Sequence, residues 1–425
     1  MGAPSQRSGE IKSPNPETKT SAGGNVLYLC TTFPRLSETF VEREVRQLSE
    51  STPLHIVSMW GGGKSKDLPV DAIPLWKLLS LFGIIPLWLL RNPVGMLSIT
   101  QRFFRRFPKS FLNLQEVLLG MGMGILLASR VAKEKPRWIH AIWATAPATA
   151  ALTIQSLIGT RFSFGAHAYD LFQDGGDCLL AEKISAATWI RTSTQAAAEE
   201  LIRRGAPPKK INLIRRGLPE LPQKIGPRPA EGTIRLLSIG RLVPKKGYPD
   251  FIRLCNALDR HGVSFEATII GEGPLRSALT EQIRSLKLEP KIRLLGSLPR
   301  PEVEPYLKEA DLFIFTGVVS RDGDRDGLPN VIPEALAHGI PVLTRSAPGV
   351  LEAIHHDETG IVLSGSIPED WAAQVIGLWS DTGKRTALSS NGRKWVEENF
   401  LSQNNTQKLL EKILSSPELK FEDQK

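Results

Sequence analysis

Positively charged residues that suit a diphosphate ligand follow a predicted strand in the second half of the chain. The segment SIGRLVPKKGY, residues 238–248, places four of interest there: Gly240, Arg241, Lys245 and Lys246. Arginine offers a planar fork of donors and lysine a compact charge, so Arg241 and Lys246 together can neutralise two phosphate groups. A solvated basic loop is the alternative, and the position directly after a strand favours a binding site.

Three aspartates at alternate positions in RDGDRDGLPN invite interpretation as a metal loop. Asp322, Asp324 and Asp326 are spaced as the first ligands of an EF-hand are, with Gly327 after them. The twelfth position needs a bidentate glutamate and is Pro333, and the flanking patterns are a strand and a helix instead of two helices. We therefore exclude a calcium site and expect no metal.

The same segment predicts the N-terminus of a helix. Gly327 lets a ligand approach the backbone, Pro329 suits a first helical position, and the NH groups near Asn330 form a small anion site. Asp326 precedes this helix, and Glu334 lies eight residues later, about two turns inside it. Ionised carboxylates only accept hydrogen bonds, so the two suit the hydroxyl groups of a sugar and of a ribose.

The N-terminal half contributes a histidine and a capped helix. RFSFGAHAYDLF runs from a strand into a helix with His167 at the junction, where it could donate to a sugar hydroxyl or to developing charge. Taken alone, this position favours a half-buried structural histidine. In residues 33–48, Ser37 as N-cap and Glu38 in the first turn predict a helix that borders the same ligand cleft.

Two series of alternating strands and helices must position these residues, and such alternation predicts parallel sheets covered on both faces. The predicted strands are residues 26–30, 55–58, 138–143, 162–164, 189–191 and 211–214 in the first series, and 235–239, 267–270, 292–295, 312–315, 342–344 and 360–363 in the second. Helices of the second series include residues 250–260, 274–286 and 330–337.

A proline-rich stretch separates the two series and divides the chain into domains. The predicted parts are a flexible tail at 1–24, a Rossmann-like domain at 25–216, a linker at 217–232, a second Rossmann-like domain at 233–388 and a C-terminal segment at 389–425. Ligands of such sheets bind beyond the carboxyl ends of the strands, so we expect the site in a cleft between the domains.

Composition limits the possible partners and compartments. The 425 residues are 41% hydrophobic, which excludes a mainly disordered chain, and 53 Lys and Arg against 44 Asp and Glu leave a net charge of +9 that suits an anionic partner. Three widely separated cysteines imply neither a disulfide framework nor a zinc site, which indicates a reducing, cytoplasmic compartment.

Residues 71–137 combine ten Lys and Arg with three Asp and Glu and with many aromatics, a mixture typical of a membrane interface. In QRFFRRF, arginines 102, 105 and 106 form one helical stripe beside phenylalanines 103, 104 and 107, and Pro108 is expected to end that helix. A solvated face over a core stripe is equally supported. The apolar runs at 78–90 and 117–129 are too short to span a bilayer, and no nucleic-acid motif accompanies the charge.

The sequence resembles the family 4 retaining glycosyltransferases, or glycosyl transferases group 1, which have the two-domain GT-B fold. GRLVPKKG, GEGP, LLGSLPRPEVEPYLKEADLFI, DGLPNVIPEALAHGIPVL and ETGIVL follow in family order over residues 240–363, and FPRLSETFVEREV, IHAIWAT and FSFGAHAYDLF extend the match into the first half. Among such enzymes it is similar to those of exopolysaccharide and colanic-acid assembly. The resemblance also implies that the C-terminal helix packs back on the first domain.

The resemblance implies a role for each matching residue. Arg241 and Lys246, after Gly240, would bind the donor diphosphate, Glu334 the ribose, and His167 the sugar from the other domain. Asp326 would bind the transferred sugar with the backbone of Gly327, Leu328, Pro329 and Asn330. The sequence departs from the family at Asp326, where a longer Glu is usual, and at Ile142, where many relatives have His.

The implied reaction is transfer of a sugar, with retention, from a nucleotide-sugar substrate to a glycan or lipid-linked acceptor at the inner face of the cytoplasmic membrane. Retention in this family is commonly explained by front-face return, in which a phosphate oxygen of the leaving group takes the acceptor's proton. That scheme needs cations and neither a cofactor nor a metal. A sugar-nucleotide 2-epimerase of the same fold and an inactive anion-binding scaffold are the alternatives.

Overall fold

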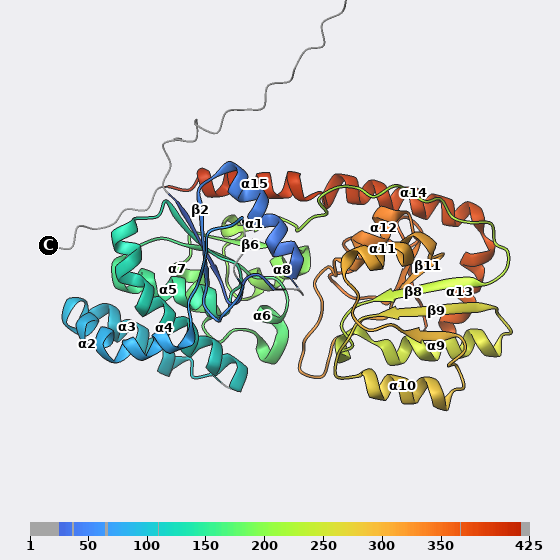
Figure 1. Cartoon of the computed structure of the whole chain (residues 1–425), viewed down its shortest axis with the longest axis horizontal. Coiled ribbons are helices and arrows are strands. Elements are labelled where there is room, and N and C mark those ends of the chain that lie inside the picture. Colours follow the sequence, from blue (N-terminus) through green and yellow to red (C-terminus); the bar gives the residue numbers. More distant parts are fainter. Residues whose placement is uncertain (1–24, 36–37, 64–66, 109, 366, 418–425) are drawn as a thin grey trace, which may run out of the picture.

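The computed structural model describes residues 25–35, 38–63, 67–108, 110–365 and 367–417 and shows two α/β domains side by side (Figure 1). Each domain has one sheet in which the named strands pair in parallel. The sheet orders are β3-β2-β1-β4-β5-β6-β7 and β10-β9-β8-β11-β12-β13. The predicted flexible tail at 1–24 and the predicted N-cap Ser37 lie outside the described residues.

The N-terminal domain contains β1 to β7 and the helices that cover them. Its strands are β1 (Val26–Cys30), β2 (Leu54–Ser58), β3 (Val70–Ala72), β4 (Trp138–Ala141), β5 (Ser163–Gly165), β6 (Trp189–Thr192) and β7 (Ile211–Leu213). Its helices are α1 (Thr39–Ser51), η2 (Leu75–Ser80), α2 (Leu81–Arg91), α3 (Pro93–Arg105), α4 (Phe111–Glu134), α5 (Ala146–Ile158), α6 (Tyr169–Phe172), η3 (Gln173–Gly175), α7 (Leu180–Ala186), α8 (Gln195–Arg203) and η4 (Pro208–Lys210).

The C-terminal domain contains β8 to β13. Its strands are β8 (Ile234–Ile239), β9 (Phe265–Ile270), β10 (Ile292–Leu294), β11 (Leu312–Phe315), β12 (Val342–Thr344) and β13 (Ile361–Val362). The helices are η5 (Pro244–Lys246), α9 (Tyr248–Arg260), α10 (Arg276–Ser285), α11 (Arg300–Glu309), α12 (Val331–His338), α13 (Asp370–Ser380) and α14 (Thr382–Asn399), followed by α15 (Ser402–Leu414).

The predicted strands are confirmed to within two residues at each end, because strands buried on both faces read as continuous apolar runs. The sequence VLYLC of β1, for example, is buried throughout. The edge strand β3 was not predicted, since its three half-buried residues, VDA, give no such run.

The C-terminal segment returns to the N-terminal domain through a crossing next to the linker. Leu218 donates its NH to the carbonyl of Phe400 at 2.8 Å, and Ser402 donates its NH to the carbonyl of Leu218 at 2.8 Å. Beyond the crossing, α15 lies beside α1 (Figure 1). Leu409 and Ile413 are fully buried in the N-terminal core. The predicted boundary at 388/389 falls inside α14, which packs on α12, so the crossing comes after Asn399.

Helix α4 packs closely on α5 through two glycines. A Cβ atom on Gly124 would lie 2.5 Å from the Thr153 Cβ and 2.7 Å from the Ala150 carbonyl oxygen, and Gly120 meets Thr149 in the same way. In the part of the chain that the structure describes, α4 is the one single helix that is long and apolar enough to cross a membrane by length and composition, and 56% of its apolar window is buried. Residues Leu75–Arg91 and Pro93–Arg105 pass the same test only when counted together across a bend of 117°. Helix α4 extends beyond the run at 117–129 and packs as a core helix.

The glycine contact between α4 and α5 gives a test of this packing. We expect Gly124→Ala to lower the free energy of unfolding of the N-terminal domain by about 1–3 kcal/mol, because the added methyl group has no room. Gly377→Ala is the matched control, since nothing lies within 4 Å of its Cβ position in α13. Urea unfolding of both variants measures the difference, and equal midpoints would contradict the close packing.

Candidate active site at the domain interface

The loop that follows β8 carries Arg241 and Lys246, the residues predicted to bind a diphosphate, and its backbone conformation is fixed by close contacts. Gly247 has a φ of 67°, and its missing Cβ would lie 1.9 Å from the Thr316 carbonyl oxygen, so only glycine fits there. The hydroxyl of Tyr248 donates to the Gly240 carbonyl at 2.9 Å. Both ends of the loop are thereby tied to the C-terminal domain, at the carboxyl end of its sheet.

Two lysines of this loop form ion pairs with the aspartates of the segment before α12. The Lys246 Nζ lies 2.8 Å from an Asp326 carboxylate oxygen. Lys245 Nζ lies 2.9 Å from Asp324 and 3.6 Å from Asp326. With the exposed Arg241, the cluster has three positive and two negative charges and therefore a formal charge of +1.

Asp326 is a largely buried carboxylate within this cluster. Burial alone would raise its pKa, but the charges of Lys246 and Lys245, with a further effect of Arg241, lower the pKa below its ordinary value. Asp326 is therefore ionised and holds Lys246. The structure brings together Arg241, Lys246 and Asp326 as the sequence predicts.

His167 lies at the end of β5 with its imidazole turned into its own domain. Its side chain is 5% exposed, Nδ1 is 3.1 Å from the Ser193 hydroxyl and Nε2 is 3.4 Å from an Arg216 Nη2. Arginine only donates, so Nε2 is the acceptor and Nδ1 carries the proton. Burial first, then Arg216 and Arg191, lower the pKa of His167 well below its ordinary value, so the ring is neutral.

In this conformation the two ring nitrogens of His167 contact Ser193 and Arg216 of its own domain. Its carbonyl oxygen is what the C-terminal domain approaches, since a Cβ on Gly327 would lie 3.6 Å from that oxygen. Contact between the imidazole and a sugar stays a prediction, and it requires one of the two ring nitrogens to leave its present partner.

Arg216 belongs to a buried charged network that the sequence analysis did not find. Its guanidinium lies 4.5 Å above the Phe40 ring, and it is 3.6 Å from Glu44, which also binds Arg191 at 2.6 Å. Burial would raise the pKa of Glu44, but Arg191 and Arg216 lower it to about 2. Arg216 thus links a buried carboxylate to His167 from the last position before the linker.

Helix α12 begins at Val331, one residue after the start of the predicted range 330–337 and two residues after Pro329, which was expected to suit a first helical position. Its first helical residue is Val331, with Asn330 as N-cap, so Pro329 lies outside the helix instead of at its first position. The Ile332 NH already donates to the Pro329 carbonyl. Leu328 is half-buried between the cleft and the core.

Glu334 accordingly lies in the first turn of α12, not two turns inside it. Its carboxylate accepts a hydrogen bond from Arg300 at 2.5 Å. Arg43 of α1, in the other domain, is electrostatically coupled to both residues. Glu334, the residue predicted to bind the ribose, therefore lies where the N-terminal domain approaches α11 and α12.

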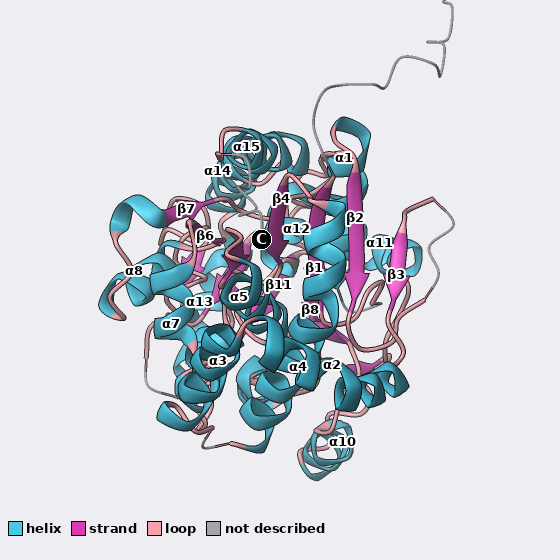
Figure 2. Cartoon of the chain, turned by 90° about the vertical axis from the view of Figure 1, so that its left-hand side faces the viewer, coloured by secondary structure: helices cyan, strands magenta, loops and turns pink. Residues whose placement is uncertain are grey.

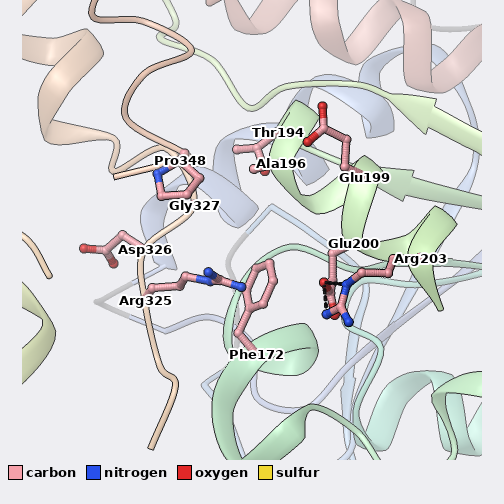
Figure 3. Close-up of a pocket in the computed structure, with 11 residues that line it drawn as sticks. Phe172, Thr194, Ala196, Glu199, Glu200, Arg203, Arg325, Asp326, Gly327 and Pro348 are labelled. Atoms are coloured by element: carbon pink, nitrogen blue, oxygen red, sulfur yellow. Dashed lines mark hydrogen bonds and ion pairs between the residues drawn. The ribbon is translucent and has the colours of Figure 1, made fainter. Parts of the chain in front are cut away.

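A cavity of about 260 Å³ lies between the two domains, and Figure 3 shows its walls. It is lined by Phe172, Thr194, Ala196, Glu199, Glu200 and Arg203 from the N-terminal domain and by Arg325, Asp326, Gly327, Pro348 and Gly349 from the C-terminal domain. The guanidinium of Arg325 extends over the Phe172 ring at 3.7 Å, whereas the Asp326 carboxylate points the opposite way.

Direct contacts close the cleft beside this cavity. Glu352 binds Arg215 at 3.0 Å and accepts the NH of Ala196 at the start of α8 at 3.2 Å. Asp174 donates its NH to the Asp322 carbonyl at 3.0 Å. These residues pair across domains that are far apart in the sequence, so no local pattern indicated them.

Within the described residues no group of three or more His, Cys, Asp or Glu could hold a metal ion. Asp324 and Asp326 are occupied by lysines, and Asp322 contacts the segment 173–174. The donor set is therefore unlike a cation site.

Glu116 of α4 is a further acidic group near the carboxyl ends of β4 and β5. Tyr169, which follows β5, donates to its carboxylate at 3.4 Å. Burial, together with the negative charges of Asp177 and Asp170, raises the pKa of Glu116 to about 7. The apolar sequence around Glu116 in α4 gives no signal that this carboxyl group has a raised pKa.

Comparison with solved structures identifies the fold of this chain, and a family model matches its second half. The chain has the GT-B fold: the Anabaena protein HepE, solved in complex with UDP and glucose, aligns with a TM-score of 0.66 and 16% identity over 92% of this chain and all of that chain. Residues 223–395 match the model of the family Glycosyl transferases group 1.

Two curated proteins are similar to this chain in sequence. "Amylovoran biosynthesis glycosyltransferase AmsK" of Erwinia amylovora is 33% identical over 204 residues, 47% of this chain and 50% of that protein. "Putative colanic acid biosynthesis glycosyltransferase WcaL" of Escherichia coli K12 is 32% identical over 214 residues, 48% of this chain and 51% of that protein. The chain spans about half the length of these curated relatives. The family resemblance drawn from the sequence is confirmed.

The raised pKa of Glu116 predicts a pH-dependent cost to stability. Between its ordinary value of 4.5 and about 7, the unfolded chain loses this proton while the folded chain keeps it, so folding becomes less favourable as pH rises. Between pH 4.5 and pH 8 we expect Glu116→Gln to gain about 3 kcal/mol of stability relative to wild type, because glutamine carries no proton that must be lost.

Urea unfolding at several pH values measures this difference. The exposed Glu281→Gln on α10 is the control and should follow the wild type. A gap between Glu116→Gln and wild type that does not change with pH would contradict the assignment.

Proposed function

We propose that the chain is a retaining glycosyltransferase that moves a sugar from a nucleoside-diphosphate sugar to a glycan or lipid-linked acceptor in exopolysaccharide synthesis. The observation that carries the proposal is the Arg241–Lys246 cation pair, fixed at the carboxyl end of β8 in the domain of the matched family. The names of the two relatives, both exopolysaccharide biosynthesis glycosyltransferases, support the substrate class.

The proposed binding step exchanges one anion for another at Lys246. A donor diphosphate would replace Asp326 as the partner of Lys246, with Arg241 on the second phosphate. The released Asp326 carboxylate would then accept a hydrogen bond from a hydroxyl of the transferred sugar. Glu334, now bound to Arg300, would turn to the ribose.

The proposed chemical step relies on these cations. The bond between the sugar and the diphosphate breaks while the acceptor hydroxyl attacks from the same face, and a leaving phosphate oxygen takes the hydroxyl proton. Lys246 and Arg241 stabilise the negative charge that develops on the leaving group, which is preorganised electrostatic catalysis. The neutral His167 would serve as a hydrogen-bond partner of the sugar instead of a charged one.

The proposed location is the cytoplasmic face of the membrane, where a lipid-linked acceptor would be available. All three cysteines are free thiols, which agrees with a reducing compartment. The glycosyltransferase names of the relatives favour transfer over the sugar-nucleotide 2-epimerase and the inactive scaffold.

Removal of either cation tests the proposal. We expect Lys246→Ala and Arg241→Ala to lower kcat for donor hydrolysis or transfer by about 10²–10³ and to leave the fold intact, since each removes a group that stabilises developing charge. Arg284→Ala on the exposed face of α10 is the matched control. Near-normal turnover by both variants would contradict the role of the pair.

A thermal-shift screen with UDP-, GDP- and ADP-sugars identifies the donor. A donor at about 100 times its dissociation constant should stabilise the protein by about 2.7 kcal/mol. The shift should disappear in Lys246→Ala and persist in Arg284→Ala. A flat response of the wild type to all donors would contradict the proposal.

A further inference from the structure

Exposed apolar side chains gather on one region of the N-terminal domain. Of the 21 large hydrophobic residues that are exposed in the described chain, 14 lie between Leu75 and Leu118. They are Leu75, Trp76, Leu79, Phe82, Leu87, Leu89, Leu90, Val94, Leu97, Phe104, Phe107, Phe111, Leu112 and Leu118. Soluble proteins seldom expose apolar side chains in such concentration, so this surface, which we name the apolar insert, requires a partner.

Helix α2 at the centre of the apolar insert is hydrophobic on all sides. Its sequence is LFGIIPLWLLR, and Trp88 alone among its residues is buried. Phe82 and Leu90 are each 84% exposed. A helix that is apolar all round is stable in a core or in lipid. One side of α2 packs on the N-terminal core through Trp88, Leu81, Ile84 and Ile85, and its other side is exposed.

The charge of the apolar insert indicates the sign of its partner. The sequence between Asp71 and Glu116 contains no Asp or Glu and six Lys or Arg, so the segment carries a formal charge of +6. Basic residues beside apolar helices are typical of proteins that bind anionic lipid. Two copies of the insert facing each other would instead place like charges together, which disfavours a second copy as the partner.

The apolar insert is held firmly on the domain. Asn92, between α2 and α3, donates to the Leu157 carbonyl at 2.9 Å and caps the Gly95 NH at 2.8 Å. Helices α2 and α3 meet at a bend of 117°, and α2, α3 and α4 lie along one side of the domain in Figure 2. The bend reverses the direction of the chain between the two helices.

The basic stripe predicted within QRFFRRF is only partly available to lipid. Arg102 donates to the Ser156 hydroxyl at 3.0 Å, and Arg106 binds Glu182 at 3.0 Å. Helix α3 ends at Arg105, so Phe107 lies outside it. The feature that most distinguishes this surface is therefore its exposed apolar side chains and not an arginine stripe on one helix.

We infer that the apolar insert embeds in one leaflet of a bilayer that contains anionic phospholipid. The side chains of α2 enter the acyl-chain boundary, and the surrounding lysine and arginines contact the headgroups. The inference rests on the proposed function for its purpose, since it places the enzyme at a lipid-linked acceptor. It assigns the binding energy mainly to apolar burial, so binding should persist at high salt.

Vesicle flotation tests this inference with the full-length protein. The vesicles contain phosphatidylcholine with or without phosphatidylglycerol, at low salt and at about 1 M NaCl, where the Debye length is about 3 Å. We expect the wild type to float with the anionic vesicles at both salt concentrations. Phe82→Glu/Leu90→Glu should lose at least about tenfold of its vesicle binding, since each buried Phe or Leu contributes about that factor.

A matched variant and a second variant complete the design. Ile202→Glu/Leu414→Glu makes the same kind of change at exposed apolar positions outside the insert and should float like wild type. Trp76→Glu/Leu79→Glu, at other exposed positions of the insert, should fail to float even if the first variant does not fold. Equal flotation of wild type and the insert variants overturns the inference.

Two further outcomes also overturn it. One is a wild type that binds no vesicle. The other is a wild type that sediments as a dimer without lipid and is dissociated by Phe82→Glu/Leu90→Glu, which would assign the insert to a second copy.

Donor hydrolysis without lipid separates this inference from the proposed function. We expect the insert variants to hydrolyse the donor as wild type does. If the wild type floats with vesicles but hydrolyses no donor, the proposed function is contradicted and membrane binding by the apolar insert is supported. If it hydrolyses the donor but does not float, membrane binding is contradicted and the proposed function is supported.

Discussion

Ion pairs to two lysines of the C-terminal domain hold residues 324–326, which also contact the other domain. The side chains of Arg325 and Asp326 point in opposite directions (Figure 3). Asp324 and Asp326 face Lys245 and Lys246 of their own domain, and Arg325 faces the Phe172 ring of the other. This arrangement thus places the charges of the candidate diphosphate site and a contact between the domains.

This geometry explains which parts of the site could be predicted from the sequence. Arg241 and Lys246 follow a strand with a strong apolar pattern, so their position at the carboxyl end of the sheet could be predicted from the local sequence. The three alternate aspartates resemble a metal loop in composition, and only the position of the lysines shows what they bind. The start of α12 was predicted one residue early, and Pro329, which was expected at a first helical position, lies before the helix because proline also suits the turn that precedes one.

Long-range pairing explains what the sequence could not show. The network of Glu44, Arg191 and Arg216 joins residues from α1, β6 and the end of the N-terminal domain, and each looks like an ordinary surface charge in the sequence. A buried charged side chain is destabilising unless an opposite charge pairs with it, and which residues pair is determined by the tertiary structure. The orientation of His167 follows from this network, so its side chain direction was beyond local prediction.

The two chain crossings near Leu218 and Phe400 are hydrogen-bonded to each other, and Gly217 has room only for a hydrogen against the backbone of Ser402. The domains are therefore joined along a single edge by a paired strap instead of by two separate tethers. Such a joint resists sliding and swivelling and leaves opening about that edge as the soft motion. The rim of the cleft farthest from the strap travels the greatest distance in such a motion, whereas groups beside the strap scarcely move.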